Sequence, residues 1–151
     1  MEQTAKKKIV LQSLIFAITF VIAFFGAKYL FSRNKNTPNA MLLEASQEMN
    51  KSMPKMIDAE TRLDSTSVTD ETLNYHYTLM HVHNDSSKAS FDQVKLEMAS
   101  KAQINLDSNP AMQDYRENNI ALHYIFKDKE KNEVFDYTVK PKPKPKPKTT
   151  N

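Results

Sequence analysis

The sequence contains no cysteine and no tryptophan, and it has one glycine in 151 residues. Without cysteine the chain cannot form a disulfide framework, a thiol nucleophile, a cysteine-ligated metal site or a lipoprotein attachment. The one glycine, Gly26, lies inside a long apolar run. A glycine-rich phosphate loop, a dinucleotide fingerprint and a nucleophile elbow each need glycine at fixed positions. Nucleotide-dependent and α/β-hydrolase chemistry are therefore excluded.

Basic residues are concentrated at the two ends of the chain, although the net charge is only +3. Residues 1–36 carry six Lys/Arg and one acid, residues 37–139 carry ten Lys/Arg and seventeen acids, and residues 140–151 carry five Lys and no acid. The middle of the chain is thus acidic, and an acidic domain repels phosphate backbones. No nucleic-acid partner is expected.

The apolar run Ile9–Phe31 follows eight mostly polar residues. As a helix it is long enough to cross the ~30 Å hydrocarbon core of a bilayer. It predicts a retained transmembrane helix over residues 9–31, with residues 1–8 as a cytoplasmic tail. The alternatives are a cleaved signal peptide and a buried core helix. Phe25, at position −3 for cleavage after Ala27, is too large for the small-residue pattern of a cleavage site.

The orientation of this span depends on a nearly even distribution of positive charge. Lys6, Lys7 and Lys8 precede the span with the amino terminus, and Lys28, Arg33 and Lys35 lie at its end or beyond. The positive-inside rule slightly favours a cytoplasmic amino terminus. The sequence therefore predicts a single-pass protein of the bacterial inner membrane with its C-terminal domain in the periplasm.

Residues 32–139 show the patterns of one soluble α+β domain, which we expect to be a small antiparallel sheet with helices on one face. A helix beginning at Pro38, capped by Thr37, carries an apolar stripe and closes at Pro54. The stripe is more typical of a core-facing side than of a methionine-rich partner-binding face. Its members are Leu42, Ala45, Met49 and Met53.

The rest of the domain alternates strand and helix signals. Residues 73–82 alternate as a half-buried strand, with Leu73, Tyr75 and Tyr77 on one face and Asn74 and His76 on the other. A helix capped by Ser90 and a short helix over residues 110–117, capped by Asn109, follow. Residues 120–126 and 133–139 then predict a hairpin around a polar turn.

The segment from Asn50 to Asp64 and the Leu-x-Tyr-x-Tyr strand after it carry a resemblance. They resemble a family of small bacterial envelope proteins that share Asn-x3-Pro-x2-[Ile/Val]-Asp-x-Glu-Thr-Arg-Leu-Asp, often behind an N-terminal anchor or signal. The resemblance covers residues 45–139 and implies an envelope location, but it carries no activity. The matching residues are Asn50, Pro54, Ile57, Asp58, Glu60, Thr61, Arg62, Leu63, Asp64, Leu73, Tyr75 and Tyr77.

The Lys-Pro tail, residues 140–151, alternates a cation with a residue that has no backbone N–H. Proline at every second position favours an extended, polyproline-II-like segment, so we expect the tail to be disordered. It is similar in composition to the Pro-Lys region of TonB-type energy transducers. Five lysines are candidates for binding an anionic surface: Lys140, Lys142, Lys144, Lys146 and Lys148.

Two groups of side chains could carry chemistry. His81 and His83 would point the same way on a strand, as metal ligands do, with Asp85 or His123 as a third ligand. The interpretation we favour places these rings at the rim of a sheet face, so no metal is expected.

The second group lies between Ile57 and Ser65 and would share one parity in an extended segment. Its four residues can be a catalytic carboxylate pair, a partner-binding patch or a structural charge ladder. We expect no catalytic residue here and treat the group as the partner-binding candidate. Its members are Asp58, Glu60, Arg62 and Asp64.

Three functions fit these features. The favoured one is a non-catalytic, membrane-anchored envelope protein whose periplasmic domain binds another protein, as an accessory of assembly or secretion. The second is a TonB-like tether that acts through the Lys-Pro rod. The third is a metal-dependent or acid–base enzyme built on His81, His83 and the acidic group. No cofactor is expected, and the sequence leaves the partner and the oligomeric state open.

Overall fold

A computed structural model describes residues 38–82 and 89–142. The predicted span Ile9–Phe31, the cap Thr37 and the candidate ligands His83 and Asp85 lie outside these residues. No helix within the described ranges is long and apolar enough to cross a bilayer. The elements are α2 (Pro38–Asn50), β1 (Lys55–Met56), β2 (Thr61–Thr69), β3 (Thr72–Leu79), α3 (Ala89–Ser108), the 3-10 turn η1 (Pro110–Met112), α4 (Gln113–Glu117), β4 (Ala121–Lys127) and β5 (Glu133–Val139).

The five strands form one sheet in the order β1-β2-β3-β4-β5. All neighbouring pairs are antiparallel except β3 and β4, which run parallel. The expected α+β class is confirmed, but the expected antiparallel sheet is wrong at this central pair. Helices α3 and α4 lie between β3 and β4 in the chain and form a crossover connection. The crossover returns the chain to the end of the sheet at which β3 begins, so β4 can run parallel to β3.

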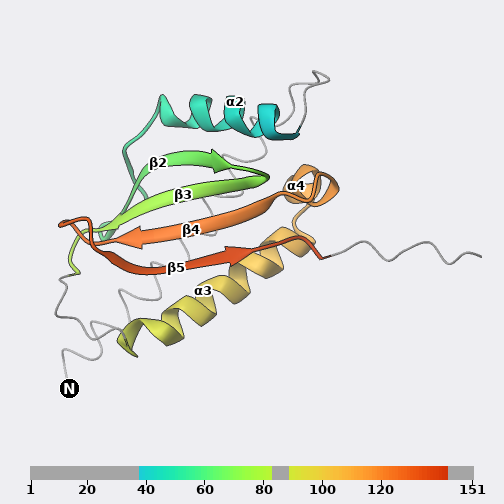
Figure 1. Ribbon diagram of the computed structural model, residues 1–151. Helices are drawn as coiled ribbons and strands as arrows, with labels where there is room; N and C mark the ends of the chain where they lie inside the picture. The colour runs from blue at the N-terminus through green and yellow to red at the C-terminus, as the bar shows by residue number, and fades with distance from the viewer. Residues whose placement is uncertain (1–37, 83–88, 143–151) are drawn as a thin grey trace, which may run out of the picture.

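The helices pack on one face of the sheet. Helix α2 packs against β2 and α3 against β5, so the two helices lie along opposite edges (Figure 1). Buried side chains of α2, α3 and α4 belong to one cluster with those of the strands. In α2 the predicted stripe is confirmed, since Leu42 and Met49 are buried; the helix ends at Asn50, and Met53 packs against the cluster beyond it.

Stacked aromatic rings form the centre of this face. The parallel register places Tyr75 beside Tyr124 and Tyr77 beside Phe126, with ring centroids 5.3 and 4.8 Å apart. Tyr137 of β5 continues the row, 4.8 Å from Tyr124. Rings in such offset stacks bury large apolar areas, and each pair adds about 0.5–1.5 kcal/mol beyond that burial. The stacked rings therefore form the centre of the buried cluster that stabilises the domain.

Strand β2 is an element that the sequence patterns did not predict. It contributes Leu63 and Thr66 to the helix-covered face, and a bulge between Leu63 and Ser65 shifts its alternation. The hydroxyl oxygens of Ser46, on α2, and Thr66 lie 2.9 Å apart. The side-chain amide of Asn50 accepts a hydrogen bond from the backbone N–H of Thr66 at 2.7 Å and donates one to the backbone carbonyl of Thr66 at 2.8 Å. Polar contacts therefore fix α2 on β2.

Turns in this glycine-poor chain use other residues in left-handed conformations. Asp70, Asn119 and Lys131 have φ angles of 52°, 55° and 73°. Asp and Asn tolerate this region because their short side chains form local hydrogen bonds. The tight turns of the described chain are thus built without glycine.

The Lys-Pro tail begins in contact with α3. Gln103 donates to the carbonyl of Lys140 at 2.9 Å, and the ammonium of Lys142 lies 2.8 Å from Asp107. The hydrogen bond from Lys142 lowers the pKa of Asp107. Lys140 and Lys142 thus contact α3, whereas Lys144, Lys146 and Lys148 lie outside the described residues, and the disorder of the tail stays a prediction.

Candidate functional site

The face of the sheet opposite the aromatic layer is polar, and we call it the polar face. Alternation along β3 places Asn74, His76 and Thr78 on it, and register brings the polar residues of β2, β4 and β5 beside them. The polar face includes Arg62, Asp64, Ser65, Ser67, Asn74, His76, Thr78, His123, Lys127, Asp136 and Thr138, with Ile125 as an apolar member.

One network on the polar face centres on Asp64. Its Oδ1 lies 2.5 Å from Nε of Arg62, and its Oδ2 accepts a hydrogen bond from Thr78 at 2.5 Å. The side chains of Arg62 and Asp64 are 32% and 22% exposed, whereas Thr78 is buried. The carboxylate is thus held from two sides, and the guanidinium remains accessible to a partner.

A second network centres on His123. Its Nδ1 lies 3.2 Å from Oδ1 of Asn74, and its Nε2 lies 2.9 Å from Oδ2 of Asp136. Lys95 reaches Asp136 from α3 at 3.8 Å. Contacts from β3, β5 and α3 therefore fix the His123 ring and its acidic neighbour.

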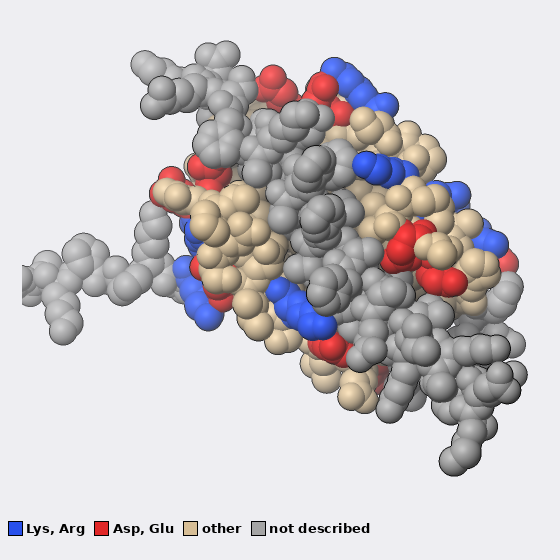
Figure 2. All heavy atoms as spheres, turned by 180° about the vertical axis from the view of Figure 1, so that it is seen from behind, with Lys and Arg blue, Asp and Glu red and all other residues tan. Residues whose placement is uncertain are grey.

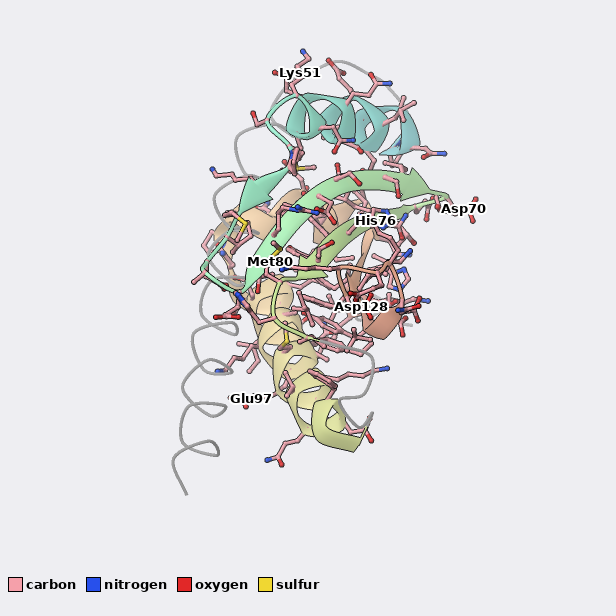
Figure 3. The ribbon with its side chains drawn as sticks, turned by 90° about the vertical axis from the view of Figure 1, so that its left-hand side faces the viewer. Lys51, Asp70, His76, Met80, Glu97 and Asp128 are labelled. Atoms are coloured by element: carbon pink, nitrogen blue, oxygen red, sulfur yellow. The ribbon has the colours of Figure 1, made fainter. Side chains whose placement is uncertain are left out.

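His76, which Figure 3 labels, forms a third contact with Ser67. Its Nε2 and the hydroxyl oxygen of Ser67 lie 2.8 Å apart. Burial lowers the pKa of His76, and Lys127 and His123 lower it further. A neutral imidazole beside a hydroxyl is a nucleophile–base geometry. Within the described ranges, however, no carboxylate binds the other nitrogen of His76. The pair is more simply a hydrogen bond that fixes β2 to β3.

The four residues of the sequence's acidic group do not form one ladder. Arg62 and Asp64 meet on the polar face, but Asp58 and Glu60 lie in the turn before β2. Asp58 accepts the backbone N–H groups of Glu60 and Thr61 at 2.7 and 2.8 Å. Asp58 therefore has a structural role in the turn, and Glu60 bonds to His81.

Of the proposed histidine ligands, His81 and His123 are not brought together, and His83 lies outside the described residues. His81 follows the end of β3, whereas His123 is opposite Asn74, so the two lie about 20 Å apart along the sheet. In the part of the chain that the structure describes, no three His, Cys, Asp or Glu side chains form a group that could hold a metal. That the protein binds no metal stays a prediction.

Sequence reasoning missed most of the polar face. The alternation of residues 73–82 had already separated Asn74 and His76 from the tyrosines, and this was the available signal. The contributions of Ser67 and Asp136 need the register of strands far apart in the chain. Figure 2 adds that acidic and basic side chains are interspersed over the described atoms of the side it draws.

A family model described as Domain of unknown function (DUF8479) matches residues 36–135, more than half of the chain. The chain belongs to this family. The DUF8479 match runs from just before α2 into β5 and includes the motif that begins at Asn50. No curated protein matches the chain.

Two solved structures of similar fold come from bacterial proteins. A candidate secreted protein from Pseudomonas aeruginosa has a TM-score of 0.55 at 17% identity, covering 67% of this DUF8479 chain and 87% of that chain. The pilotin EpsS of the Vibrio vulnificus type 2 secretion system has a TM-score of 0.51 at 7% identity, with coverages of 68% and 86%. At these identities the likeness shows a shared fold.

Proposed function

We propose that this DUF8479 protein is a non-catalytic accessory protein of the bacterial envelope, and that its domain binds another protein through the polar face. The segment Ile9–Phe31 anchors it in the inner membrane, and the domain lies in the periplasm. The apolar run supports the anchor, and the fold shared with a candidate secreted protein and a secretion-system pilotin supports the location.

The polar face is the observation that carries this proposal. Its charged side chains are held by neighbours within the sheet, as in Arg62–Asp64–Thr78 and Asn74–His123–Asp136. A partner therefore meets side chains whose rotamers are already fixed, which reduces the entropy lost on binding. Polar groups in fixed positions give specificity to a protein interface.

The same face gives little support to catalysis. Ser67 and His76 lack a third group that would orient the ring as a general base, judged over residues 38–82 and 89–142. The open pocket of about 480 Å³ lies at one end of the sheet and is lined by other residues, including Asp70 and Asn119. Binding is the function that this geometry supports best.

The test is affinity capture with crosslinking from intact membranes that carry the full chain. We expect Arg62→Glu to reduce capture of the partner several-fold, because it places a second negative charge beside Asp64. The domain itself should lose only about 1 kcal/mol, since partly exposed ion pairs contribute little to stability.

Lys101→Glu is the matched control, because Lys101 is a partly exposed cation on α3 paired with Glu97. It makes the same charge change away from the polar face and should leave capture unchanged. If Arg62→Glu melts the domain while the partner stays bound, or if both variants behave alike, the polar face is not the binding surface.

A further inference from the structure

We propose that the partner of the polar face presents an acidic segment, with a carboxylate next to an apolar side chain, and that this segment lies across four strands of the sheet. The inference rests on the proposed function and names the chemistry that the polar face binds. The residues that receive the segment follow one another across neighbouring strands, and we call them the cross-strand row. They are Met56, Arg62, Thr78 and Lys127.

The register of the sheet places these four side chains in line. Met56 is opposite Arg62, and Thr78 is opposite both Arg62 and Lys127. Opposite residues have their side chains on the same face of a sheet. Met56 therefore belongs to the polar face, although β1 is only two residues long. Strands β2, β3 and β4 lie side by side (Figure 1), and with β1 they make the row about 14 Å long at the usual strand spacing.

The carboxylates beside the cross-strand row already have partners within the domain. Both oxygens of Asp64 bond to residues of the row. Oδ2 of Asp136 lies 2.9 Å from Nε2 of His123, and its Oδ1 lies 3.8 Å from the ammonium of Lys95. These two acidic side chains therefore offer little to a basic partner.

The two cations of the row, by contrast, retain free donors. Arg62 binds Asp64 through Nε, and its two terminal nitrogens make no hydrogen bond within the described part of the chain. Lys127 makes no hydrogen bond or ion pair with any described residue, although Glu133 is opposite it in the register. A guanidinium presents its N–H groups as a fork that fits the two oxygens of a carboxylate. The row therefore favours a ligand that supplies negatively charged acceptors.

An exposed apolar side chain adjoins these donors. Met56 is 47% exposed and lies opposite Arg62, so a segment that pairs with the guanidinium also contacts the methionine. The flexible thioether side chain adapts to apolar partners of different shape. Long polyanions are disfavoured, because residues 37–139 carry ten Lys/Arg against seventeen acids. A short protein segment suits the row better, since about four extended residues cover its length.

Zero-length crosslinking in intact membranes that carry the full chain tests the charged part of this inference. A carbodiimide joins a lysine to a carboxylate in contact with it, and mass spectrometry identifies both residues. We expect Lys127 to be joined to an Asp or Glu of another protein. Lys127→Arg should abolish this crosslink and retain capture of that protein, whereas Lys127→Gln should reduce capture several-fold. Lys101→Gln, on α3, is the matched control and should leave capture unchanged.

Met56→Ser tests the apolar part. We expect several-fold weaker capture, because the change removes the apolar contact and leaves both cations of the row in place. Leu43→Ser is the matched control, since Leu43 is 51% exposed on α2, away from the polar face, and it should leave capture unchanged. Both side chains are about half exposed, so neither change should unfold the domain.

The outcomes separate this inference from the proposed function. Capture that survives Arg62→Glu overturns the proposed function. If Arg62→Glu abolishes capture but Lys127→Gln or Met56→Ser leaves it unchanged, the polar face remains the binding surface and the acidic segment is wrong. A Lys127 crosslink that forms only with Glu133 of its own chain, or with a phosphate group, overturns the acidic segment as well.

Discussion

At the scale of single residues, Asn50 completes an otherwise open sheet edge. Strand β1 pairs only with Arg62 and Leu63, so it leaves the later part of the β2 edge uncovered. The Asn50 amide offers Thr66 one acceptor and one donor, as the backbone of another strand does. Unpaired backbone groups on an edge strand can pair with another chain and lead to aggregation, and the Asn50 amide occupies those of Thr66.

Asn50→Ala should therefore destabilise the domain. The change leaves the N–H and carbonyl of Thr66 without their partner, and unpaired buried groups cost about 1–3 kcal/mol. Urea denaturation of the full chain in detergent measures the loss. Gln47→Ala, an exposed substitution on the same helix, should change the midpoint little. Equal effects of the two variants would contradict the pairing role.

His76 gives the stability of the domain a pH dependence. Its folded pKa is lowered by burial, Lys127 and His123, so the unfolded chain binds a proton first as the pH falls. The contribution of His76 is present above about pH 6.5 and is lost as the pH falls through that value toward the folded pKa. When the pH is lowered from 7.5 to 5.5, we expect the free energy of unfolding to fall less for the His76→Gln variant than for the wild type. A thermal melt of both proteins at each pH measures this difference. If NMR shows that His76 in the folded protein titrates with a pKa above the ordinary value, the prediction is contradicted.

At the scale of elements, the crossover from β3 to β4 decides the topology of the sheet. Arg116 of α4 stabilises this crossover. The guanidinium donates to the carbonyls of Leu106 and Asn109 at 2.7 and 2.8 Å. The last carbonyls of a helix have no partner within it, so Arg116 caps the end of α3. This contact joins the two helices of the crossover.

Arg116→Met should cost about 1.5–3 kcal/mol, because it removes two charge-assisted hydrogen bonds while keeping an apolar stem. The loss should appear in urea denaturation and as faster hydrogen exchange at the C-terminal end of α3. Lys101→Met on α3 is the control and should cost less than 1 kcal/mol. Unchanged exchange in Arg116→Met would show that the cap is dispensable.

Sequence patterns predicted the elements whose periodicity is strong and local. The stripe of α2, the alternation around Tyr75 and the hairpin ending at Val139 all reflect burial on one side. Strand β2 was not predicted because its bulge breaks the alternation of buried and exposed residues, and because Thr66 packs on α2 through polar contacts. The parallel pair was missed although the strand–helices–strand order implies a crossover. Register across that crossover, which brings His123 to Asn74, is not encoded in any local pattern.

At the scale of the whole molecule, orientation decides which compartment the polar face meets. The charges flanking Ile9–Phe31 favour a cytoplasmic amino terminus only slightly. The family match covers residues 36–135 and so includes none of this segment. The anchor and its direction therefore stay predictions.

Reporter fusions after Asn151 test this orientation. We expect alkaline phosphatase to be active there and a cytoplasmic reporter at the same position to be inactive, because the C-terminal domain should lie in the periplasm. Immunoblotting for the uncleaved chain checks that the span is retained. Activity of only the cytoplasmic reporter would reverse the predicted orientation.

The aromatic face also gives the protein an internal optical signal. Burial raises the pKa of the hydroxyls of Tyr75, Tyr77 and Tyr124 above their ordinary value, and that of Tyr115 to about 12. These groups stay protonated in the folded chain at a pH where unfolded tyrosine ionises, so folding stability falls as the pH rises past about 10. With no tryptophan to mask it, the tyrosinate absorption band of these residues should appear as the sheet opens. An alkaline titration followed by absorbance thus reports the unfolding of this core without any added label.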